Sequence, residues 1–109
     1  MAAPSTPDSA LELPELSVLS LDVAALERLF VELAFETTVL GVSVKGATSE
    51  RARSPSPSLG MAREILLHEE AVGLQIHYLH RGVEWWGTLM RAQGSVRFVR
   101  VRRDSGPKE

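Results

Sequence analysis

The chain has 109 residues, and not one of them is cysteine. This absence excludes disulfide bonds, a thiol nucleophile and every zinc site that needs sulfur. It fits a reducing compartment, and we expect a cytoplasmic protein. No apolar run approaches the roughly 20 residues that span a bilayer. Because Met1–Ser9 also lacks lysine and arginine, the sequence predicts neither a secretory signal nor a membrane partner.

Catalytic motifs are missing as well. The sequence has no HExxH, phosphate loop, GxGxxG or GxSxG pattern. His77 and His80 are three residues apart on a predicted strand, so they point to opposite faces and cannot chelate one ion. Glu64 and His68 are four residues apart on a predicted helix, a spacing that suits a metal or an acid–base pair. A solvated helix face is the simpler interpretation, so we predict no enzyme, cofactor, metal site or small-molecule substrate.

The composition is that of one ordinary globular domain, with 44% hydrophobic and 24% charged residues. We expect residues 15–103 to form this domain. Residues 1–14 are predicted to be a disordered tail, and residues 104–109 a C-terminal tail. Residues 46–57 contain Ser-Pro-Ser-Pro and are predicted to be a mobile loop. Ser54, Ser56 and Ser58, with Arg51 and Arg53, are candidates for a phosphorylation segment, but a plain disordered connector is the favoured interpretation.

Charge is unevenly distributed along the chain. Residues 1–50 hold 8 acidic and 2 basic side chains, whereas residues 51–109 hold 6 acidic and 10 basic ones. Such asymmetry indicates either a partner-binding face or two halves that attract each other within one fold. The second interpretation is favoured because neither half contains a block of five like charges.

Two amphipathic helices are predicted, after an extended lead-in over 16–21. The first covers 22–36, where apolar residues recur at helical spacing, and Ser20 or Asp22 can cap it. Its inward stripe is Val23, Leu26, Leu29, Phe30 and Leu33. The second covers 59–70 and is capped by Ser58.

The period changes to two over 37–45, 72–80, 83–90 and 96–103, which predicts four strands. Glycines between the last three strands supply the positive φ of tight hairpin turns. The element order is therefore α-β-α-β-β-β. We expect an α+β fold in which an antiparallel C-terminal meander carries both helices on one sheet face. The other sheet face is then left uncovered.

The first hairpin predicts which side chains share a face. A two-residue turn at Arg81-Gly82 places Trp85 opposite Tyr78 on the apolar face. It places Trp86 opposite His77 on the uncovered face, because adjacent side chains of a strand point in opposite directions. One tryptophan is therefore expected in the core and the other on the mixed face.

The register of the last strand stays open. A two-residue turn at Gln93-Gly94 sets Val101 beside Trp86, whereas a three-residue loop sets Arg102 against it. In either register an arginine of this strand can lie over a tryptophan. Trp86 is then either a docking residue or a covered residue that serves stability alone.

These observations predict a small non-enzymatic protein-interaction domain, such as an adaptor, a regulator or an assembly factor of a larger complex. Its partner would be another protein or a second copy, and a homodimer would bury Trp86 symmetrically. The alternative is single-stranded nucleic-acid binding through the arginine-rich last strand, with the indole stacking on a base. The predicted binding residues are Trp86, His77, Met90, Arg97, Arg100 and Arg102.

Overall fold

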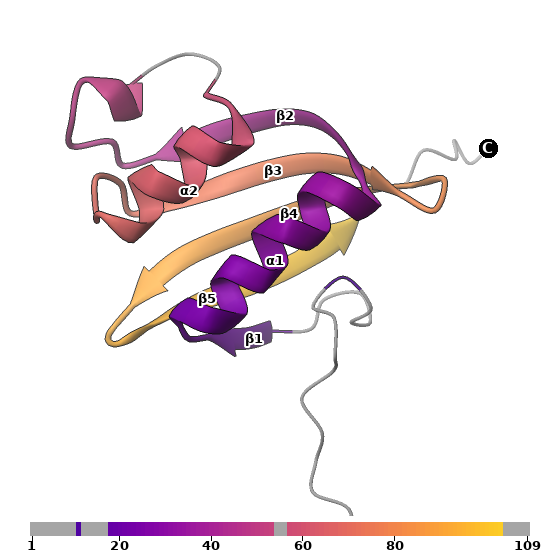
Figure 1. Ribbon diagram of the computed structural model, residues 1–109, viewed down its shortest axis with the longest axis horizontal. Coiled ribbons are helices and arrows are strands. Elements are labelled where there is room, and N and C mark those ends of the chain that lie inside the picture. Colours follow the sequence, from indigo (N-terminus) through magenta and orange to yellow (C-terminus); the bar gives the residue numbers. More distant parts are fainter. Residues whose placement is uncertain (1–10, 12–17, 54–56, 104–109) are drawn as a thin grey trace, which may run out of the picture.

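The computed structural model describes residues 11, 18–53 and 57–103, and five antiparallel strands form one sheet in the order β1-β5-β4-β3-β2. The strands are β1 (Val18–Leu21), β2 (Thr38–Lys45), β3 (Gly73–His80), β4 (Val83–Ala92) and β5 (Ser95–Arg102). The helices α1 (Val23–Glu36) and α2 (Leu59–Leu67) lie on the same side of the sheet (Figure 1). This arrangement confirms the expected α+β class with both helices on one face. Apart from Leu11, the two predicted tails lie outside the described residues.

The sheet has one strand more than the sequence predicts. Residues Val18–Leu21 are expected only as an extended lead-in, but they form the edge strand β1. This strand pairs with β5, with Leu19 opposite Phe98. The chain then crosses the sheet through α1 to reach β2 at the opposite edge (Figure 1). A pairing between opposite ends of the chain leaves no local pattern in the sequence, so periodicity alone misses it.

Both helices begin where their capping residues predict. The Asp22 carboxylate accepts a hydrogen bond from the backbone N–H of Ala25 at 2.8 Å, and Ser58 caps α2 in the same way. Each cap satisfies a backbone donor that the first turn of a helix leaves unpaired. Among the described residues, neither helix combines the length and the apolar character that crossing a membrane requires.

The second helix stops three residues before the predicted boundary. The reason is the left-handed backbone of Glu69, whose φ is 59°. The N–H groups of Glu69 and Glu70 then donate to the carbonyls of Leu66 and Ile65, at 3.1 and 2.9 Å. This pattern closes the last helical turn and leads the chain back toward β3.

Two-residue turns join the last three strands, as predicted for the first of the two turns. Arg81 and Gly82 both have positive φ, 55° and 79°, which is the backbone that a tight hairpin with the natural strand twist needs. Tyr78 therefore lies opposite Trp85. The second turn, at Gln93-Gly94, also has two residues. The last strand therefore adopts the register that pairs Trp86 with Val101, one of the two left open by the sequence.

The core lies between the sheet and the two helices. Its largest fully buried side chains are Tyr78, Phe98, Leu11, Leu26, Leu29, Leu33, Ile65, Leu66, Leu74, Ile76 and Leu89. A Cβ on Gly87 would lie 3.0 Å from Phe98 and 3.2 Å from Tyr78, so glycine lets two core rings pack onto the backbone. Val23 is a correction to the predicted stripe, because it lies in the first turn of α1 and is exposed.

The described part of residues 46–57 contacts the rest of the fold through a short turn and through hydrogen bonds to Glu70. A short 3-10 turn, η2 (Arg51–Arg53), lies in it and buries Ala52. Glu70 accepts hydrogen bonds from Arg51 at 2.7 Å and from Ser49 at 2.8 Å. Arg51 first and Ser49 second lower the pKa of this carboxyl from its ordinary 4.5 to about 2. Of the candidate phosphorylation sites, Ser54 and Ser56 lie outside the described residues, and Ser58 caps α2.

Candidate interaction surface

The sheet face that points away from the helices is here called the open face, and no described helix or strand covers it. Its members follow from strand alternation, because residues such as Leu74 and Leu89 are buried on the helix side. The open-face residues are Val18 and Ser20 of β1, Arg97, Val99 and Val101 of β5, Glu84, Trp86, Thr88 and Met90 of β4, Gln75, His77 and Leu79 of β3, and Thr38, Gly41, Ser43 and Lys45 of β2.

Polarity divides the open face into two halves. The half formed by β1, β5 and β4 is the more apolar one. Its apolar residues are Val18, Val99, Val101, Trp86 and Met90, and they alternate with Ser20, Arg97, Glu84 and Thr88. The half formed by β3 and β2 is mainly polar. An antiparallel sheet that meets water on one face normally alternates polar residues outward. The apolar half departs from that pattern, and such a patch commonly marks an interaction site.

The centre of the open face is a stacked pair of rings. His77 and Trp86 lie opposite each other on β3 and β4, with ring centroids 4.2 Å apart and planes within 7°. The Nε2 N–H of His77 donates to the carboxylate of Glu84. Glu84 also accepts a hydrogen bond from Arg103 at 3.1 Å. These contacts hold the Trp86 ring in one orientation while it stays half-buried rather than sealed in the core.

Of the six predicted binding residues, four lie together on the open face. These are Trp86, His77, Met90 and Arg97, the last two being paired directly across β4 and β5. Arg102 pairs with Trp85 and therefore belongs to the helix side of the sheet. The predicted set is thus split by strand alternation.

Arg100 is the clearest correction to the predicted set. Its side chain is only 5% exposed, because its guanidinium lies 3.7 Å from the centre of the Trp85 ring and donates to the carbonyl of Leu11. The expected arginine–tryptophan contact therefore forms, but with the core-side tryptophan. Leu11, assigned to a disordered tail, is buried as a member of the core. Burial raises the pKa of the adjacent Tyr78 hydroxyl, and Arg100 opposes that shift.

This division weakens the nucleic-acid hypothesis. The arginines predicted to hold phosphates are Arg91, Arg97, Arg100, Arg102 and Arg103. Arg97 and Arg103 lie on the face that carries Trp86, and Arg103 is paired there with Glu84, whereas the other three lie on the helix side of the sheet. A stacking platform needs its cations and its aromatic ring on one surface. The geometry therefore favours the protein-interaction hypothesis.

The Glu64–His68 pair lies on the exposed surface of α2. The Glu64 carboxylate is 3.5 Å from Nδ1 of His68 and also accepts a hydrogen bond from Arg63 at 2.8 Å. Within the part of the chain that the structure describes, no group of three or more histidine or carboxylate side chains is placed to hold a metal ion.

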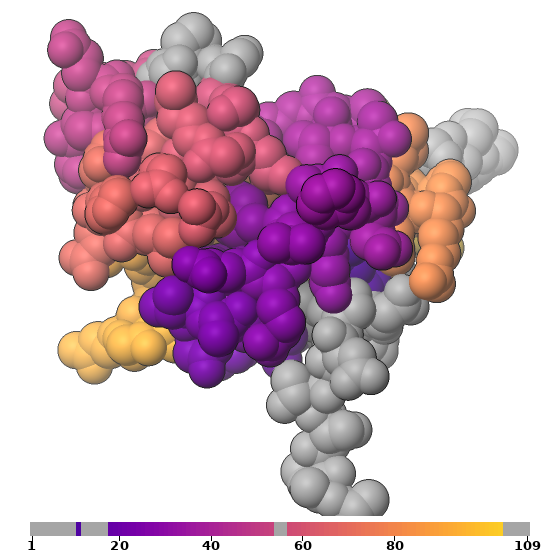
Figure 2. Space-filling view, in the orientation of Figure 1, coloured from indigo at the N-terminus to yellow at the C-terminus, as the bar shows by residue number. Residues whose placement is uncertain are grey.

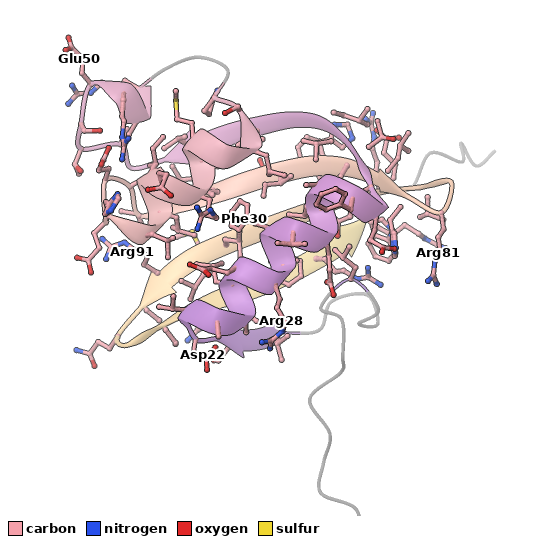
Figure 3. All side chains as sticks on the ribbon, in the orientation of Figure 1. Asp22, Arg28, Phe30, Glu50, Arg81 and Arg91 are labelled. Carbon is pink, nitrogen blue, oxygen red and sulfur yellow. The ribbon has the colours of Figure 1, made fainter. Side chains whose placement is uncertain are left out.

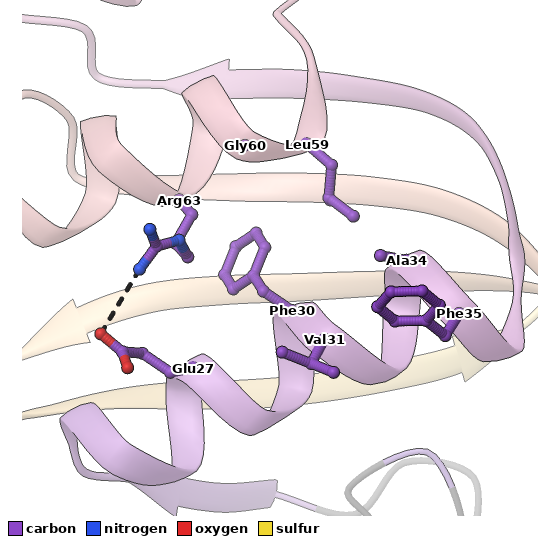
Figure 4. A pocket seen from close by; sticks show the side chains of 8 residues that line it. All are labelled: Glu27, Phe30, Val31, Ala34, Phe35, Leu59, Gly60 and Arg63. Carbon is purple, nitrogen blue, oxygen red and sulfur yellow. Dashed lines mark hydrogen bonds and ion pairs between the residues drawn. The ribbon is translucent and has the colours of Figure 1, made fainter.

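The helical side of the molecule, which faces the viewer in Figure 2, carries a second apolar surface that the sequence did not predict. A groove of about 420 Å³ runs between α1 and α2. Phe30, Val31, Ala34 and Phe35 line it from α1, and Leu59, Gly60 and Arg63 line it from α2 (Figure 4). Phe35 is 84% exposed. The signal available in the sequence was the excess of apolar residues in α1 over what one inward stripe requires.

An ion pair between the two halves of the chain lies at this groove. Glu27 of the acidic first half pairs with Arg63 of the basic second half, 3.4 Å apart at one end of the groove (Figure 4).

Comparison with protein-family models, with curated proteins and with solved structures finds no match for this chain. What the chain does therefore has to be inferred from its own surfaces.

Proposed function

We propose that this chain is a small non-enzymatic protein-interaction domain that binds its partner through the open face. It would act as an adaptor, a regulator or an assembly factor, in the cytoplasm as the sequence suggests. The observation that carries the proposal is the Trp86 ring, which is stacked on His77 at the centre of a face that no described element covers.

The fixed orientation of Trp86 favours this role. Binding costs free energy when side chains must be ordered at the interface, and a ring already held by its neighbours has less freedom to lose. Tryptophan is also among the residues that contribute most to binding when they lie near the centre of an interface. Val101, paired with Trp86 across the strands, is exposed, and Met90 is a further exposed apolar residue on the same face, so a partner would remove further apolar surface from water.

The area of the open face is that of a small protein–protein interface. Strands spaced about 4.8 Å apart and about 26 Å long make a five-stranded face of roughly 600 Å². Standard interfaces bury about 800 Å² on each partner. The open face therefore suits a reversible complex rather than a permanent one.

Site-specific photo-crosslinking tests the proposal. A photoreactive amino acid replaces Val101 on the open face or, as a matched control, Val72, a valine of similar exposure (38% and 43%) outside that face. The probe at position 101 should yield a discrete protein adduct in cells, and the probe at position 72 should not. Adding Trp86→Ala should remove the adduct. Equal adduct yields at the two positions, or adducts indifferent to Trp86→Ala, would refute the proposal.

A further inference from the structure

The outer edge of β2 is a strand edge without a partner strand. β2 is the last strand of the sheet, and within the described part of the chain no hydrogen bond reaches its outer side. It forms the upper border of the sheet in Figure 1. With 8 residues it is also longer than β1, the strand at the other edge, which has 4. An exposed edge of this length is a template on which another strand can pair.

The bonding of the neighbouring strands shows which backbone groups β2 presents outward. The N–H of Arg91, near the end of β4 (Figure 3), donates to the carbonyl of Val72 at 2.9 Å. Bonding alternates along a strand, so the even-numbered residues of β3 bond to β4 and the odd-numbered ones bond to β2. Ser43 is opposite an odd-numbered residue and bonds inward. The N–H and C=O groups of Val42 and Val44 therefore point away from the sheet.

Only the two ends of β2 carry the features that normally prevent edge-to-edge pairing. Leu40 forms a bulge at one end, and Lys45 is the last residue at the other. Bulges, charges and prolines are the usual devices that block an exposed edge. The stretch between them, Gly41–Val44, contains no charge and no proline. A regular, uncharged segment of the edge is therefore open to pairing.

The two sides of this segment set what the pairing strand must look like. Val42 and Val44 point to the helix side and pack against the core, yet both stay half-buried where the sheet ends. Ser43 points to the open face and is exposed. A strand that continues the sheet must then bring β-branched apolar residues to the helix side and small residues to the open face. β2 of a second copy has this pattern.

We infer that β2 pairs antiparallel with β2 of a second copy about a two-fold axis at Ser43. In this register Val42 lies opposite Val44 of the second copy, so a hydrogen-bonded valine pair stands on each side of the axis. Moving the register by two residues would set one valine against Leu40 of the bulge or against Gly46, whose φ is 64°. The register centred on Ser43 is thus the one that uses both outward-facing valines.

Charge and symmetry agree with this contact. Lys45 of one copy lies opposite Gly41 of the other, so the two lysines are about 13 Å apart along the strands and no like charges meet. The same residues contribute from both copies, so the contact closes at a dimer. The two open faces come to lie side by side and form one surface of about 1,200 Å². The inference concerns the edge of the sheet and does not depend on the proposed function.

Single cysteines test the position of the axis, because the chain has none of its own. Ser43→Cys should form an intermolecular disulfide under mild oxidation. Opposed residues of a non-hydrogen-bonded antiparallel pair have Cα atoms about 4.5 Å apart, a distance that a disulfide spans. Ser20→Cys is the matched control, an exposed serine of the open face on the other edge strand, and should stay monomeric. Equal yields of cross-linked dimer from the two variants would overturn the inference.

Sedimentation velocity from micromolar to millimolar concentration measures the contact without a cross-link. The wild type should form a dimer and nothing larger. Ser43→Lys and Ser43→Glu each place like charges opposite each other and should dimerise about fivefold more weakly. Their equimolar mixture should dimerise at least as tightly as the wild type, because opposite charges then meet. Ser43 is exposed, so both variants should keep the wild-type circular dichroism spectrum.

Amide hydrogen exchange identifies the edge itself. The N–H groups of Val42 and Val44 should exchange more slowly as concentration rises, because pairing takes them out of water. A wild type that stays monomeric, or that dimerises without slowing these amides, would show the inference to be wrong. A dimer that Val101→Glu abolishes and the Ser43 variants leave intact would mean that two open faces bind each other. The adduct at position 101 decides the proposed function separately in every case.

Discussion

Trp85 and Trp86 offer a direct test of which side of the sheet is the surface. They are neighbours in β4 but point to opposite faces. We predict that Trp86→Ala lowers the free energy of unfolding much less than Trp85→Ala. The comparison is closely matched, because the residue type, the substitution and the strand are the same.

The expected magnitudes follow from the surroundings of the two rings. Replacing a buried aromatic residue by alanine costs about 3–5 kcal/mol. Trp85 is only partly buried, so it should fall near the lower end of that range. It packs against the core, and its loss also leaves the buried Arg100 guanidinium without the ring beneath it. Trp86 loses a stacking contact worth about 0.5–1.5 kcal/mol and part of its burial. Water fills the space it leaves, so we expect about 1–2 kcal/mol in total.

Urea unfolding followed by far-ultraviolet circular dichroism measures both values without relying on tryptophan fluorescence. With a slope of about 1 kcal/mol per molar urea, Trp86→Ala should lower the midpoint by about 1–2 M and Trp85→Ala by about 3 M or more. A domain of this size has a total stability of about 5–10 kcal/mol, so the Trp86 variant should stay folded. If Trp86→Ala were as costly as Trp85→Ala, Trp86 would be a core residue, and the docking role of the open face would be refuted.

Two further predictions concern the caps and anchors of the fold. Asp22→Ala should lower the free energy of unfolding by about 1 kcal/mol in the same urea titration, because α1 loses its cap. Asp22→Asn keeps a side-chain oxygen that can accept the hydrogen bond, so it should lower the free energy of unfolding much less. Equal losses in the two variants would mean that the hydrogen bond is not the cause. The pKa of Glu70 is lowered to about 2 by Arg51 and Ser49, so the stability gained from this carboxylate is complete above pH 4.5 and is lost as the pH falls toward 2. Thermal melts over that interval should show Glu70→Gln losing less stability than the wild type, and parallel curves for the two proteins would contradict the anchoring role.

Local signals in the sequence determined much of this protein. Asp22 and Ser58 predicted where the helices begin, because a cap acts on backbone groups within one turn. The Arg81-Gly82 turn predicted the register of the hairpin, and the period of two then sent Trp85 and Trp86 to opposite faces. The placement of Trp86 and His77 as one pair on the open face therefore required no knowledge of distant contacts.

The tertiary structure decided what depends on residues far apart in the chain. Pairing of β1 with β5 joins opposite ends of the sequence, and the burial of Leu11 and Arg100 depends on their meeting beside Trp85. Phe35 is exposed because the sheet beneath α1 is already covered by the inward stripe of the same helix. Periodicity shows which side chains share a face of an element, but which faces meet depends on how distant elements pack together, and that packing is settled only when the whole chain folds.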